Sequence, residues 1–122
     1  MLAAVARLVA QGTDLTWLIV GDGVLRAGLQ RRVAAAGLQA RVRFLGLKAQ
    51  AQVADLLRAA DVFALSSAYE GMPMAALEAL GSGLPVASTD VGEVRQVVKP
   101  GVNGAISADR SEDGFAACLA EV

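Results

Sequence analysis

Glu70 and Glu78 are the side chains of this sequence best placed to bind a polar ligand. Glu70 opens the loop segment 70–73, which directly precedes a predicted helix. The free amides and positive dipole end of a helix N-terminus attract anions such as a diphosphate, so Glu70 would project beside that anion. Glu78 lies among apolar residues of the same helix, where a carboxylate needs solvent or a hydrogen-bonding partner. A sugar hydroxyl would be such a partner, although a helical glutamate is more often an exposed, solubilising residue.

Small and polar residues also gather directly after four predicted strands. Ligands of open parallel sheets bind beyond the carboxyl ends of the strands, so these positions mark the candidate site. Glycine ends strands and begins turns in any such fold, and a single cluster therefore carries little weight, whereas four together favour a site. The clusters are Gly21-Asp22-Gly23, Gly46, Ser66 to Gly71, and Ser88 to Gly92.

Predicted strands and helices alternate along the whole chain. Short apolar strands separated by amphipathic helices are typical of a parallel sheet covered by helices on both faces. We therefore predict one α/β, Rossmann-like domain over residues 1–122, with Ser111 capping the last helix. The helices are predicted at 1–11, 25–36, 50–60, 73–80, 93–98 and 111–121, and the strands at 15–20, 42–45, 62–65, 84–87 and 104–106.

Composition excludes several classes of function. Hydrophobic residues make up 55% of the chain, enough for a core, and the net charge of -1 leaves no basic surface for nucleic acid. One cysteine and no histidine exclude disulfides, zinc clusters and histidine-dependent catalysis. The acidic residues form no spaced set of oxygen ligands, so no metal site is predicted. No apolar run approaches the roughly 18 residues of a membrane-spanning helix, which predicts a soluble protein, and the cysteine usage fits the cytoplasm.

Six segments, in this order and spacing, resemble the retaining glycosyltransferases of the GT-B type, in the large group 1 or family 4 class. They run almost from end to end of the chain, and they resemble the C-terminal, donor-binding domain of these two-domain enzymes. The segments are Trp17 to Gly23, Arg41 to Gly46, Ala59 to Phe63, Ser66 to Gly71, Leu77 to Leu80, and Gly83 to Gly92.

The resemblance implies a donor that is a nucleoside-diphosphate sugar, with UDP or GDP as the nucleotide, and no further cofactor or metal. It implies front-face transfer with retention of the anomeric configuration. Glu70 would bind sugar hydroxyls and Glu78 the ribose. For Lys48, an exposed cation after a strand is an equally good interpretation. The remaining implied contacts are Gly71, Met72 and Pro73 at the phosphates, Leu47 and Lys48 against the base, and Gly21 and Asp22 on the floor of the site.

The sequence also departs from the family pattern. The family's first strand and its glycine, arginine and lysine loop, its N-terminal acceptor domain and its final helix are not recognised here. We therefore expect the isolated chain to be inactive and to bind nucleotide weakly. We also expect a break in the sheet between strands 15–20 and 62–65. Direct pairing of those strands, unravelling of the first helix, or a strand from a second copy in a homo-oligomer would close it.

Two functions from different classes remain open. The first is part of an enzyme of cell-envelope or exopolysaccharide synthesis, cytoplasmic and peripheral at the inner membrane. The second is a non-catalytic nucleotide-binding or self-associating module derived from the same fold. A related epimerase or phosphorylase is disfavoured, because the histidine, lysine and arginine sets of those enzymes are not found here.

Overall fold

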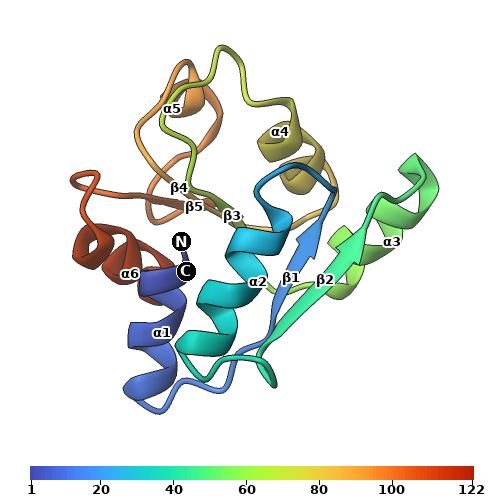
Figure 1. Ribbon diagram of the computed structural model, residues 1–122. Helices are drawn as coiled ribbons and strands as arrows, with labels where there is room; N and C mark the ends of the chain where they lie inside the picture. The colour runs from blue at the N-terminus through green and yellow to red at the C-terminus, as the bar shows by residue number, and fades with distance from the viewer.

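The computed structural model describes all residues from 1 to 122 and has the predicted α/β architecture, in which helices and parallel strands alternate (Figure 1). The helices are α1 (Leu2–Ala10), α2 (Arg26–Ala35), α3 (Gln50–Ala59), α4 (Met74–Gly81), α5 (Val94–Val97) and α6 (Glu112–Glu121). The strands are β1 (Trp17–Val20), β2 (Val42–Gly46), β3 (Phe63–Leu65), β4 (Val86–Ser88) and β5 (Gly104–Ile106). None of the helices has the length and apolar character needed to cross a bilayer.

The strands form two separate parallel sheets. β1 pairs with β2, Trp17 opposite Val42, and β4 lies between β3 and β5. β1 and β3 do not pair, so the predicted break in the sheet is confirmed. Two of the three predicted ways of closing it are wrong, because these strands stay apart and the first helix remains helical.

Helix α1 packs against both halves of the molecule. Ala4 is fully buried and packs with Phe115 and Ala116 of α6, and Figure 1 shows α1 and α6 side by side. On another side of the same helix, Val5 packs with Val33 and with core residues of β1 and β2. The helix therefore joins the β1–β2 half of the molecule to the half that contains β3, β4 and β5. Ala4, Val5 and Leu8 of α1 are buried, and Leu2, Ala6 and Val9 are partly buried, because α1 packs on two sides.

Several predicted boundaries move by one or two residues. β1 begins at Trp17 rather than at residue 15, because its pairing begins opposite Val42. β4 begins at Val86 rather than at residue 84, since Leu84 instead donates its amide hydrogen to Ala79 O at the end of α4. Pro73 precedes the first turn of α4 instead of lying in it. The predicted cap of α6 is confirmed, with Ser111 Oγ accepting from the Gly114 amide at 2.9 Å.

Candidate functional site

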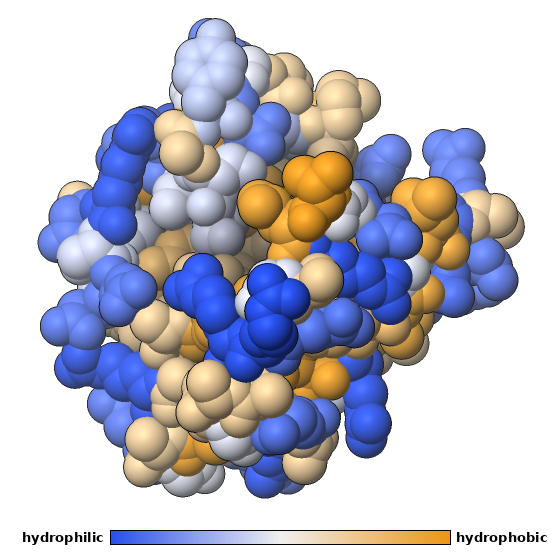
Figure 2. All heavy atoms as spheres, in the orientation of Figure 1, coloured by the Kyte–Doolittle hydropathy of each residue, from blue (hydrophilic) through white to orange (hydrophobic).

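A hollow of about 340 Å³ lies where the loops after β3, β4 and β5 meet. Figure 2 shows weakly polar surface in the upper part of the molecule, over these loops, with strongly hydrophilic residues to its left and below it and apolar residues to its right. Of the predicted site residues, the structure brings Glu70 and Gly71 into this hollow. The lining residues are Ala68, Tyr69, Glu70, Gly71, Asp90, Val91, Gly92, Glu93 and Arg110.

Glu70 is half-buried and has a defined orientation. The Ser67 hydroxyl donates a 2.7 Å hydrogen bond to Glu70 Oε1, whereas Oε2 accepts no hydrogen bond from the chain. The loop that contains Glu70 follows β3 directly and leads into α4. One carboxylate oxygen is thus held by the protein, and the other is available to a ligand.

The backbone amides between Glu70 and the N-terminus of α4 have no hydrogen-bonding partners. No side chain caps α4, and the amides of Gly71, Met72 and Met74 donate no hydrogen bond within the chain. Pro73 is buried and has no amide hydrogen, so it anchors this turn without competing for an acceptor. Uncapped amides at the positive end of a helix dipole are suited to an anion.

Glu78 lies outside the hollow. Its side chain is exposed on α4 and has neither a hydrogen bond nor an ion pair within the chain. Of the two options expected for this carboxylate, solvent or a hydrogen-bonding partner, the structure shows solvent: Ala76 and Ala79 face the core, and Glu78 is exposed. An exposed carboxylate remains accessible to a ligand lying along α4.

The residues predicted to contact the base and those predicted to form the floor of the site gather at the end of the β1–β2 sheet. Gly21 donates its amide hydrogen to Gly46 O at 2.8 Å, which brings the loops after β1 and β2 together. Asp22 lies beside the Arg26 guanidinium at 3.6 Å. Leu47 is 80% exposed, and Lys48 is exposed without an ion pair. Apart from Glu78 on α4, the predicted site residues thus form two groups, one at the carboxyl end of each sheet.

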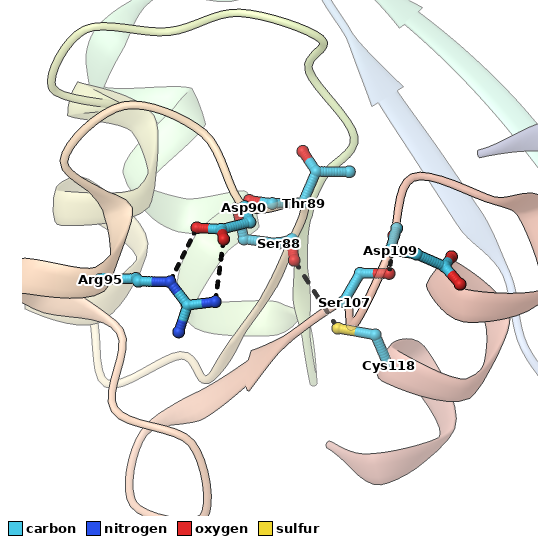
Figure 3. Close-up of polar contacts among 7 residues, drawn as sticks. All are labelled: Ser88, Thr89, Asp90, Arg95, Ser107, Asp109 and Cys118. Atoms are coloured by element: carbon cyan, nitrogen blue, oxygen red, sulfur yellow. Dashed lines mark hydrogen bonds and ion pairs between the residues drawn. The ribbon is translucent and has the colours of Figure 1, made fainter.

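Glu93 and Arg110 are charged residues of the hollow that were not singled out from the sequence, and Asp90 of the hollow pairs with Arg95 beside it. The Arg95 guanidinium makes two hydrogen bonds to the Asp90 carboxylate, at 2.9 and 2.8 Å, as Figure 3 shows. That hydrogen bonding lowers the pKa of Asp90, and Arg110 lowers it further through its charge. Arg110 follows β5, and applying the strand-end rule to this fifth strand as well would have found it.

Comparisons with known proteins show the family of this chain. Residues 1–122 match the family described as "Glycosyl transferases group 1". The 2-deoxystreptamine glucosyltransferase of Streptomyces kanamyceticus is 40% identical over 73% of this chain and 23% of its own length. The D-inositol 3-phosphate glycosyltransferase of Thermobispora bispora is 35% identical over 100% of this chain and 31% of its own.

Solved structures have the same fold. The lipopolysaccharide outer core galactosyltransferase WaaB, in its apo form, superimposes with a TM-score of 0.82 at 28% identity, over 95% of this chain and 34% of that one. HepE of Anabaena, in complex with UDP and glucose, superimposes with a TM-score of 0.80 at 28% identity, over 95% of this chain and 32% of that one. The chain therefore spans about a quarter to a third of these relatives, and it belongs to the group 1 glycosyltransferase family, where it corresponds to the C-terminal portion of GT-B enzymes.

Proposed function

We propose that this chain is the donor-binding half of a retaining glycosyltransferase. The enzyme takes a hexose from a nucleoside-diphosphate sugar and transfers it to a glycan or a lipid-linked acceptor. The observation that carries the proposal is the loop of Glu70, Gly71 and Met72, in which a partly free carboxylate stands directly before the uncapped amides of α4. A sugar diphosphate presents hydroxyls and an anion side by side, which this pair of features complements.

In this proposal each group of residues binds one part of the donor. The amides of Gly71 and Met72 bind the diphosphate, and Glu70 accepts hydrogen bonds from hydroxyls of the transferred sugar. Glu78 accepts from the ribose. Exposed Leu47 packs against the base with Lys48 beside it, and the loop of Gly21 and Asp22 forms the floor. The site contacts the base at one sheet and the sugar at the other.

The proposed reaction needs little acid or base chemistry from this chain. The bond from the anomeric carbon to the leaving diphosphate breaks, and the acceptor oxygen bonds to that carbon from the same face. The acceptor's proton passes to the departing phosphate oxygen. Fixed amides and the dipole of α4 stabilise the charge that develops on the leaving diphosphate. Positioning of the two reactants supplies most of the remaining effect, and the acceptor belongs to the other domain of the enzyme.

The comparisons favour UDP as the nucleotide and surface glycans as the product. Two solved relatives are complexes with UDP, one with glucose and one with GlcNAc. Named relatives include an Escherichia coli galactosyltransferase that acts on a diphosphoundecaprenol acceptor and a colanic acid biosynthesis enzyme of Salmonella. We therefore propose a role in cell-envelope or exopolysaccharide synthesis, in the cytoplasm and at the inner face of the membrane.

Binding of nucleotides to the chain tests this proposal. We expect UDP to bind with a dissociation constant of about 1 mM, because helix-end amides contribute only about 0.3 to 1 kcal/mol of charge stabilisation in exposed settings. GDP and ADP should bind more weakly in ligand-observed NMR titrations. Resonances of Leu47 and Gly71 should both shift with UDP, since base and phosphate lie at different sheets. No shift at either residue at UDP concentrations about tenfold above that dissociation constant would contradict the proposal.

A further inference from the structure

The loop after β4 holds the loop that carries Glu70. Thr89 Oγ1 donates to Ser67 O at 2.7 Å, and the Thr89 amide donates to Leu65 O at 2.9 Å. Farther along, the Glu93 amide donates to Gly71 O at 3.0 Å. Hydrogen bonds thus connect the two loops on both sides of Glu70.

Between these contacts the two backbones approach too closely for any side chain. Gly92 has a φ of +50°, and a Cβ atom there would lie 2.5 Å from Glu70 O and closer still to Gly71 O. An alanine would therefore have to push the Glu70–Gly71 peptide away from the β4–α5 loop. Gly101 is a matched contrast, with a φ of +74° and no atom within 4 Å of the corresponding position.

Ser67 transmits this constraint to the Glu70 carboxylate. Its carbonyl oxygen accepts from the Thr89 hydroxyl, and its own hydroxyl donates to Glu70 Oε1 at 2.7 Å. The position of Ser67 therefore sets the rotamer of Glu70, and Thr89 sets the position of Ser67. Thr89 thus orients Glu70 Oε2 through Ser67, without contacting Glu70 itself.

The base of this series of contacts is buried and fixed. Thr89 is 7% exposed and Ser88 is fully buried. Ser88 Oγ donates to Thr89 O at 2.7 Å, and Cys118 Sγ of α6 lies 3.8 Å from Ser88 O, a contact drawn in Figure 3. A threonine held from both sides is a rigid support rather than a mobile surface residue.

We propose that Thr89 and Gly92 are positioning residues that fix Glu70 for the sugar of the donor. Thr89 does not line the hollow, and Gly92 acts through its close backbone approach to Glu70 and Gly71. The proposal rests on the proposed function of Glu70 as the ligand of the sugar hydroxyls. These residues would contribute to donor specificity, since a correctly oriented Glu70 distinguishes a nucleotide sugar from the bare nucleotide.

Substitution of Thr89 separates positioning from general stability. Thr89→Val keeps the shape and removes the hydroxyl, whereas Thr89→Ser keeps the hydroxyl. We expect Thr89→Val to weaken binding of UDP-glucose roughly two- to tenfold and to leave UDP binding unchanged. Thr89→Ser should bind both ligands about as tightly as the unsubstituted chain does. Ligand-observed NMR measures these affinities. Equal weakening of UDP and UDP-glucose, or a Thr89→Ser variant as weak as Thr89→Val, would overturn the proposal.

The glycine pair gives a readout that needs no ligand. Gly92→Ala should shift the amide resonances of Glu70 and Gly71 in a ¹H–¹⁵N spectrum, and Gly101→Ala should leave them in place. Unmoved Glu70 and Gly71 resonances in folded Gly92→Ala protein would overturn the positioning role. If these resonances move but the unchanged chain does not distinguish UDP-glucose from UDP, the coupling of the loops holds and the assignment of Glu70 to the sugar fails.

Discussion

Glu70 and Glu78 have identical side chains and different surroundings. Glu70 is held by the Ser67 hydroxyl at the edge of a hollow, and Glu78 is exposed on α4 with no partner. A preoriented carboxylate loses little conformational freedom when a ligand binds, whereas a free one must be ordered by the ligand. The two glutamates should therefore respond differently to substitution.

Glu78→Gln should weaken binding of UDP and of UDP-glucose by the same factor. A neutral amide accepts hydrogen bonds from ribose hydroxyls less strongly than a carboxylate does, and the loss is at most about 1.5 to 3 kcal/mol when such bonds are buried. Calorimetry or NMR titration measures it, with Glu121→Gln, at another exposed helical glutamate, as a control. Unchanged binding of both ligands would remove Glu78 from the site.

Glu70→Ala should instead weaken UDP-glucose and spare UDP, because its proposed contact is to the sugar alone. In the complete enzyme, turnover with the natural donor should fall as well. Ligand-observed NMR titrations with UDP and with UDP-glucose measure the two affinities separately. A Glu70→Ala variant that lost UDP affinity and kept full turnover at saturation would reverse the roles assigned to the two glutamates.

The Asp90–Arg95 pair predicts a pH dependence at the rim of the hollow. Hydrogen bonds from Arg95 lower the pKa of Asp90 in the folded protein. A lowered folded-state pKa means that the stabilisation is present above the unfolded pKa of about 3.9 and is lost as the pH falls through the folded value. Arg95→Gln should move the NMR titration midpoint of Asp90 upward. A midpoint that does not move would show that the pair does not persist in solution.

Among elements, the order and type were predictable from the sequence, whereas several of the ends were not. Periodicity of apolar residues identifies each helix and strand, because burial on one face or both is a local property. Where β1 begins depends instead on its register with β2, which begins at Val42, and this is a tertiary contact. Arg110 was missed for another reason: it follows β5, a strand end to which the strand-end rule was not applied, and it lines the same hollow as Glu70.

The contact of α1 with α6 should be essential to stability. Phe115 is 3% exposed and packs with Ala4 and Ala116 between these helices. Phe115→Ala should lower the free energy of unfolding by about 3 to 5 kcal/mol, since it leaves a cavity where the two halves of the molecule join. Leu25→Ala, at a position 80% exposed, should change it by less than about 0.5 kcal/mol. Denaturant unfolding curves measure both, and equal effects would contradict this role for the interface.

At the scale of the whole molecule, the break between β1 and β3 leaves two strand edges unpaired. Each of these strands has a neighbour on one side only. Leu18 and Val20 of β1 are 39% and 41% exposed, large apolar side chains beside an unpaired edge. Neither strand contains a proline or lysine, the residues that protect natural edges from pairing with other chains.

We therefore predict that the chain self-associates through this break. Sedimentation velocity should show an average mass that rises with protein concentration, because backbone groups left unpaired at a strand edge recruit another strand. Leu18→Lys should reduce the association by placing a charge beside the edge, and Val102→Lys, at an apolar position 83% exposed in the turn before β5, should not. A strictly monomeric chain at high concentration would rule out this association, and equal effects of the two lysines would assign it to general surface hydrophobicity.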